Sequence, residues 1–138
     1  MHPALAIDHG DARIGIAATD PEGILAHPVE TIDRRRVDPI ERIAALVAER
    51  GVRTLVVGLP LRLDGSEGDS AAKVREFAAS LSARLPGLPL VFIDESFSTE
   101  SAATKLRQAG RRTKHHKPVI DQAAAVEILT LWMQSIED

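Results

Sequence analysis

Acidic residues from distant parts of the sequence are the best candidates for chemistry in this chain. Asp8 follows a short apolar run, the pair Asp94–Glu95 ends another, and Asp121 lies near the start of the last amphipathic segment. Each acid alone has a structural explanation, because a carboxylate can favour a helix N-terminus or accept hydrogen bonds from turn amides. Gathered at one site, such acids would repel one another unless a cation lay between them, and their oxygens suit Mg²⁺ or Mn²⁺. Two such ions about 4 Å apart can activate water for phosphodiester hydrolysis.

The order of secondary-structure elements decides whether these acids can meet. Short apolar runs predict strands, and apolar residues at helical spacing predict helices. Ser66, with Asp69 three residues later, resembles a capping box before the second helix. The predicted strands cover residues 4–8, 13–19, about 27–32, 54–58 and 90–94, and the predicted helices cover 39–50, about 66–84, 99–108 and 120–136.

This order predicts an α/β fold, a mixed five-stranded sheet with helices on both faces. Residues 9–12 suit a hairpin between the first two strands, whereas the later strands, joined through helices, must run parallel. In open sheets of this kind, ligands gather where the parallel strands end. Asp8, Gly58 and the pair Asp94–Glu95 stand at those ends. We therefore expect a site at that edge of the sheet.

The last predicted helix would carry Asp121 to the same edge. Counting from Asp121 in steps of three and four reaches an apolar stripe, which the helix would bury. The stripe consists of Ala124, Ala125, Ile128 and Trp132. Small side chains at 123–125 would let this helix approach the sheet closely, so the carboxylate is expected near the strand ends.

Length and composition limit the class of protein. With 138 residues, 44% of them hydrophobic, we expect one domain covering residues 1–138. The absence of cysteine excludes disulfides, thiolate zinc sites and a cysteine nucleophile. The N-terminus lacks a signal-peptide pattern, and no apolar stretch approaches the roughly 20 residues of a membrane-spanning helix. The expected location is therefore cytoplasmic, with no membrane partner.

The net charge of −3 hides a basic segment at residues 101–120, which contains no acid. Its cations are Lys105, Arg107, Arg111, Arg112, Lys114 and Lys117. Clustered cations bind polyanions by displacing counterions from phosphate, although a charge run can also be a solvated loop. The candidates for nucleic-acid binding are Arg13, Arg111, Arg112, Lys114 and Lys117. Arg13 could instead pair with Asp11.

Glycine-containing loops offer a second way to bind phosphate. Backbone amides near Gly10, Gly58, Gly65 and Ser66 could face a phosphate group, with the following helix adding its dipole. The alternative is an ordinary connection between a strand and a helix. His9, His115 and His116 have no zinc-ligand spacing, so solvent or phosphate is their expected neighbour.

Several motifs in sequence order resemble the YqgF/RuvX family over nearly the whole chain. They are residues 6–10, 13–17, 19–20, 57–61, 64–68 and 92–95, with Thr99, Ala102, Asp121, Ala123, Ala124, Ile128 and Leu129. The resemblance implies a ribonuclease-H-like fold and a Mg²⁺- or Mn²⁺-dependent nuclease. The implied substrate is pre-16S rRNA, cut at its 5′ end, with ribosomal assembly particles as implied partners, or else a branched DNA such as a Holliday junction. It also implies that Asp8, Glu95 and Asp121 form the catalytic and metal-binding set.

One departure from the family pattern concerns substrate binding. The family usually has arginine directly after Asp-Glu, where this chain has Ser96. The missing arginine favours the alternative of a non-catalytic nucleic-acid-binding factor, and the basic segment before Asp121 is a candidate to replace its charge. An actin-like ATPase is the other alternative, but such enzymes need two lobes and this chain has one. No G-x-x-x-x-G-K-[ST] phosphate loop is present.

Overall fold

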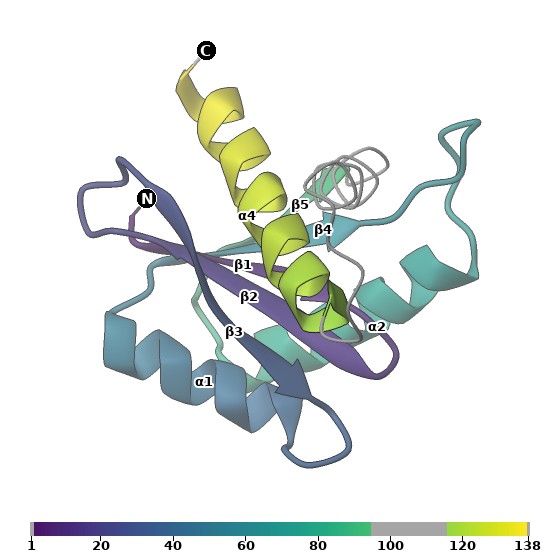
Figure 1. Ribbon diagram of the computed structural model, residues 1–138, viewed down its shortest axis with the longest axis horizontal. Coiled ribbons are helices and arrows are strands. Elements are labelled where there is room, and N and C mark those ends of the chain that lie inside the picture. Colours follow the sequence, from purple (N-terminus) through teal and green to yellow (C-terminus); the bar gives the residue numbers. More distant parts are fainter. Residues whose placement is uncertain (1, 95–115, 138) are drawn as a thin grey trace.

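The computed structural model describes residues 2–94 and 116–137, with the side chains of the last helix described from Gln122 to Ile136. Its centre is a five-stranded sheet in the order β3-β2-β1-β4-β5 (Figure 1). The strands are β1 (Ala4–His9), β2 (Arg13–Thr19), β3 (Ala26–Asp33), β4 (Thr54–Leu59) and β5 (Leu90–Asp94). The first three strands form an antiparallel meander, and β4 and β5 continue it in parallel with β1. The predicted mixed sheet, with its hairpin and its parallel crossovers, is confirmed.

Three helices are described: α1 (Pro39–Arg50), α2 (Asp69–Arg84) and α4 (His116–Glu137). The predicted limits of α1 hold because the Asp38 side chain accepts a hydrogen bond from the Ile40 amide at 3.0 Å. The helix ends at Gly51, whose φ of 64° is left-handed. The predicted helix at 99–108 lies outside the described residues.

The capping-box prediction for α2 is wrong. The residue before the helix is Gly68, and no side chain caps the helix there. Ser66 instead belongs to a loop closed by a bridge between Leu61 and Glu67. Its hydroxyl donates a hydrogen bond to Asp64 Oδ1 at 2.6 Å, so its bonding partner lies within the loop and not at the helix start.

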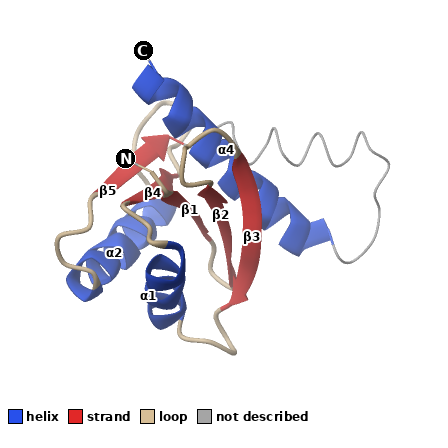
Figure 2. Cartoon of the chain, turned by 90° about the vertical axis from the view of Figure 1, so that its left-hand side faces the viewer, coloured by secondary structure: helices blue, strands red, loops and turns tan. Residues whose placement is uncertain are grey.

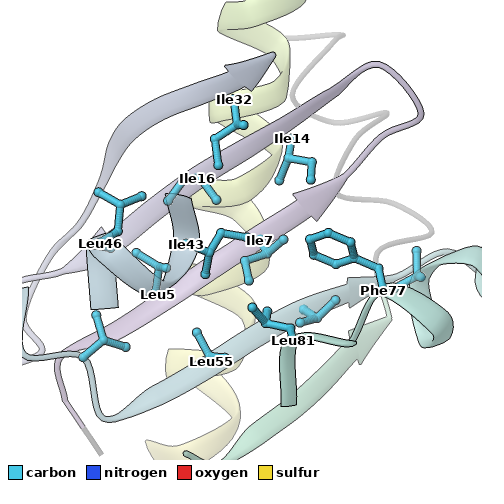
Figure 3. Packing of buried hydrophobic residues seen from close by; sticks show 14 of the residues in the cluster. Leu5, Ile7, Ile14, Ile16, Ile32, Ile43, Leu46, Leu55, Phe77 and Leu81 are labelled. Carbon is cyan, nitrogen blue, oxygen red and sulfur yellow. The ribbon is translucent and has the colours of Figure 1, made fainter. Parts of the chain in front are cut away.

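The helices cover both faces of the sheet, as predicted (Figure 2). Helices α1 and α2 pack on one face, where branched aliphatic side chains of the strands meet Ile43, Leu46, Val74 and Leu81 (Figure 3). Helix α4 packs on the other face, mainly across β1, β2 and β3. None of the described helices has the length and apolar character needed to cross a membrane.

On the face that α4 covers, β1 and β2 carry small residues. Ala4, Ala6 and Ala17 of the sheet meet Ala125 of the helix, and all four are fully buried. The whole predicted stripe after position 121 is buried: Ala124, Ala125, Ile128 and Trp132. The expected close approach of this helix to the sheet therefore follows from alanines on both sides of the interface.

Candidate active site

Asp8 lies near the carboxyl end of β1, the central strand of the sheet. Residues alternate between the two faces along a strand, and Ala4 and Ala6 pack against α4. Asp8 therefore points to the α4 face, and its side chain is half-buried. Because β1 is hydrogen-bonded on both sides, the backbone that carries this carboxylate is rigidly held.

Both neighbours of Asp8 across the sheet are glycines. Asp8 pairs directly with Gly15 of β2. On the other side, Ile7 pairs with Val57 of β4, so the next residue, Gly58, lies level with Asp8. Neither neighbour projects a side chain beside the carboxylate on the α4 face.

Helix α4 reaches the same row of the sheet. The Gln122 side chain donates a hydrogen bond to Thr31 Oγ1 at 3.0 Å, and Thr31 is paired with Gly15. Asp8, Gly15 and Thr31 therefore form one row across three strands, with Gln122 above its β3 end. Asp121 is the residue directly before Gln122 in the helix, and its backbone is described while its side chain is not.

The other predicted site residues lie at the limits of the described chain or beyond them. Strand β5 ends at the exposed Asp94, and Glu95 is the next residue, outside the described part. Arg111, Arg112 and Lys114 also lie outside it, and Lys117 is described only through its backbone in α4. Among the side chains that are described, no group of three or more histidines and carboxylates is placed to hold a metal ion.

Arg13 stands at the start of β2 and is half-buried. It alternates with Ile14, so it shares the α4 face with Gly15 and hence with Asp8. The Asp11 carboxylate that was considered as its partner pairs with Lys73 at 3.3 Å.

The predicted phosphate-loop residues have structural roles of their own. A Cβ atom at Gly10 would overlap the backbone carbonyl oxygen of Arg13, so the tight hairpin requires glycine there. Gly65 has a left-handed φ of 85°, and its amide donates a hydrogen bond to the Arg62 carbonyl at 2.8 Å. The Ser66 amide donates to Asp64 Oδ1 at 2.9 Å.

His9 points to the opposite face from Asp8, and its neighbours differ from those expected. Its ring lies 4.8 Å from the Phe77 ring, measured between centroids, and its Nε2 lies 2.8 Å from Nη1 of Arg34. Burial, and then the nearby Arg34 guanidinium, lower the pKa of His9 below its usual value. Sequence reasoning did not single out Arg34 or Lys73, because neither belongs to a motif and only the fold brings them to the Asp8–His9 segment.

The comparisons with known proteins agree with this architecture. The family model described as "RuvX: Holliday junction resolvase" matches residues 2–135. A relative from Nocardioides sp. with the description "Putative pre-16S rRNA nuclease" is 50% identical over 91% of this chain and 83% of its own length. A relative from Streptomyces coelicolor with the same description is 48% identical over 95% of this chain and 79% of its own.

Two solved structures share the fold at low sequence identity. One is Thermus thermophilus RuvC in complex with a Holliday junction substrate, with a TM-score of 0.60 and 17% identity over 97% of this chain and 95% of that chain. The other is the yeast mitochondrial Holliday junction resolvase Ydc2, with a TM-score of 0.58 and 10% identity over 96% and 78%. The predicted ribonuclease-H-like fold is therefore confirmed. Together with the family match over nearly the whole sequence, this shows that the chain belongs to the RuvX family.

Proposed function

We propose that this chain is a metal-dependent nuclease that cleaves structured precursor RNA, acting at the 5′ end of pre-16S rRNA. The observation that carries the proposal is the position of Asp8: a half-buried carboxylate on the central strand, between Gly15 and Gly58, on the face that α4 covers. Membership of the RuvX family and the descriptions of the relatives support the same activity. The nuclease would act in the cytoplasm, on the precursor RNA or on ribosomal assembly particles that contain it.

The residues around Asp8 fit a hard divalent cation. Carboxylate oxygens are the ligands that Mg²⁺ and Mn²⁺ prefer, and the two flanking glycines place no side chain of their own beside the Asp8 carboxylate. Glu95, directly after β5, and Asp121, in α4, would complete the ligand set. When bound, the metal would activate water and stabilise the charge of the leaving oxygen.

The protein's own part is to position the ligands and the substrate. The central strand fixes the Asp8 carboxylate, and the alanine interface between α4 and the sheet sets the distance of position 121 from it. Arg13, on the same face, with Arg111, Arg112, Lys114 and Lys117, would neutralise backbone phosphates. Such contacts predict RNA binding that weakens steeply with salt.

Cleavage of a four-way DNA junction is the second candidate activity. It is favoured by the description of the matching family and by the RuvC-type fold. The chemistry at the carboxylates would be the same, so the substrate must be identified by experiment rather than by fold.

The test compares the wild type with Asp8→Asn and Asp121→Asn on a precursor 16S RNA and on a four-way DNA junction, in Mg²⁺, in Mn²⁺ or in chelator. Glu49→Gln is the matched control, because it also removes one carboxylate, and Glu49 is exposed. Glu49 lies in the last turn of α1, next to the start of β4, whereas Asp8 lies at the other end of the sheet. We expect metal-dependent RNA cleavage that falls by about 10³-fold or more in both Asp variants, as loss of several kcal/mol of transition-state stabilisation implies. The control should cleave like the wild type.

Each other outcome has a definite meaning. Cleavage of the junction alone would replace the RNA substrate by branched DNA. RNA binding without cleavage, unchanged by Asp8→Asn, would identify a non-catalytic binding factor. Equal cleavage by the wild type and both Asp variants would reveal a contaminant and remove the catalytic proposal.

A further inference from the structure

A cleft lies on the face of the sheet opposite Asp8, beside the β1–β2 hairpin. Its volume is about 470 Å³, within the range of small-ligand sites. Its walls come from three segments distant in sequence: the β1–β2 hairpin, the connection from β3 into the start of α1, and the middle of α2. The lining includes His9, Asp11, Arg34, Lys73, Glu76 and Phe77. A smaller cavity of about 210 Å³ shares His9 and Lys73 and extends along α2 to Ser70 and Pro60.

Arg34 is held in this cleft by neutral groups. Its Nη1 donates hydrogen bonds to His9 Nε2 at 2.8 Å and to the Gly10 carbonyl at 2.9 Å, and its guanidinium lies 5.6 Å from the centre of the Phe77 ring. An arginine can only donate, so His9 Nε2 must be the unprotonated acceptor. Among the described residues, no carboxylate lies within ion-pair distance of Arg34. The guanidinium is therefore oriented and half-buried, and its hydrogen-bond partners in the described part of the chain are uncharged.

The arginines that follow Arg34 are in a different situation. Arg35 and Arg36 both pair with Asp33, at 3.2 and 3.6 Å, and their side chains are 76% and 83% exposed. Their charges are thus compensated and point to solvent. Arg34 differs from them in orientation and in burial, and no described carboxylate pairs with it.

The other charged groups of the cleft determine what can bind beside Arg34. Lys73 pairs with Asp11 at 3.3 Å, but both side chains are mostly exposed, so this pair is weak and Lys73 can turn to another anion. The first turn of α2, at Ser70, has no side-chain cap and adds favourable backbone charge for an anion. Two carboxylates, Glu76 and Asp11, also line the cleft and oppose an anion, although Asp11 is 79% exposed and can turn away. The fixed donors of Arg34, with Lys73 beside them, favour a ligand that presents several anionic oxygens in one place.

We propose that this cleft binds a phosphate group, held by the Arg34 guanidinium and the Lys73 ammonium on the face of the sheet opposite Asp8. The phosphate could belong to a nucleic-acid strand or to a free phosphorylated molecule, because both present the same oxygens. His9 orients Arg34 through Nε2 and acts as a positioning residue. This binding is independent of the proposed nuclease activity, because Asp8 and His9 point to opposite faces.

The test measures binding to the full-length chain in chelator, where no cleavage occurs, by calorimetry and NMR titration. The three ligands are inorganic phosphate, adenosine 5′-monophosphate and a short single-stranded RNA without terminal phosphates. We expect inorganic phosphate to bind and to shift the resonances of His9, Arg34 and Lys73. The titration with RNA identifies the source of the phosphate. If the RNA competes with inorganic phosphate, the natural ligand is a backbone phosphodiester. If only adenosine 5′-monophosphate competes, the ligand is a phosphomonoester. Absence of phosphate binding at millimolar concentration would overturn the proposal.

Four charge variants distinguish a specific phosphate site from a general effect of net charge. Arg34→Gln should weaken phosphate binding about tenfold or more, because it removes a charge-assisted fork. Lys73→Gln should also weaken it, and this exposed substitution keeps the test valid if Arg34→Gln fails to fold. Glu76→Gln should tighten it about two- to fivefold. Arg35→Gln, the matched control next in sequence, should leave it unchanged. Equal weakening by Arg34→Gln and Arg35→Gln would show that only net charge matters and would refute the site.

Discussion

The alanine interface between α4 and the sheet can be tested by enlarging one residue of it. Ala17 on β2 is fully buried, pairs with Ala6, and packs against α4. Ala17→Leu adds three carbon atoms where no space exists, and overpacking of this kind costs about 1–3 kcal/mol. For a chain of 138 residues, the unfolding entropy is about 0.3 kcal/mol/K, so Tm should fall by about 3–10 °C.

The functional effect should be larger than the loss of stability suggests. To accommodate the leucine, α4 must move away from the sheet and carry position 121 with it. A displacement of about 1 Å at a catalytic group costs about 10²-fold in rate. We therefore expect RNA cleavage to fall about 10²-fold at 25 °C, where circular dichroism should show that the protein is still folded.

Ala18→Leu provides the matched control. Ala18 is the next residue of β2 and is only 1% exposed, but it faces α1 and α2. The Ala18→Leu variant should lower Tm by a similar amount and leave the rate of RNA cleavage nearly unchanged. If Ala17→Leu lost stability and kept full activity, or if both variants lost activity equally, the position of α4 would not control catalysis and our reasoning would be refuted.

Three further predictions concern turns and surface charge. Gly51→Ala should destabilise the protein by about 1 kcal/mol in urea unfolding, because its φ of 64° is left-handed and no nearby atom would contact the new Cβ. Gly10→Ala should cost more, because its Cβ would overlap the Arg13 carbonyl oxygen; an unchanged unfolding midpoint would contradict this account of the hairpin. The hydrogen bond from Arg84 lowers the pKa of Glu41 below its ordinary value of 4.5. The pair therefore stabilises the fold at neutral pH, and this stabilisation is lost as the pH falls through the lowered pKa. Glu41→Gln should therefore make unfolding slightly less dependent on pH below 4.5, and a steeper dependence would show that the sign is wrong.

Most of the fold could be predicted because local pattern and tertiary packing agree. Pro39 at the start of α1 and Gly51 after it set limits that the structure reproduces. The strand of residues 13–19 has the predicted bounds, because turn residues flank its apolar run on both sides. Ser66 was misread because a capping box and a closed loop use the same residue types. The bridge from Leu61 to Glu67 and the helix start after Gly68 distinguish them, and residue types alone indicate neither.

The candidate site could be predicted less completely. Asp8 was identified from its place at a strand end, but the glycines beside it depend on register. Nothing in the sequence alone indicates that Gly15 and Gly58 flank one carboxylate. The role of Arg34 could not be predicted for a similar reason, because 25 residues separate it from His9, its hydrogen-bond partner. The joint ligation of a cation by Asp8, Glu95 and Asp121 stays a prediction.

The last helix covers strands that were made first. Helix α4 begins at His116, yet it packs on β1, β2 and β3, all of which precede residue 34. During synthesis on the ribosome, the meander therefore emerges with Ala4, Ala6 and Ala17 uncovered, and this surface stays uncovered until residues 116–137 have followed. A nascent chain interrupted before α4 would expose an apolar sheet face and would tend to aggregate. The docking of α4 would thus bury this surface and assemble the proposed carboxylate set in one step.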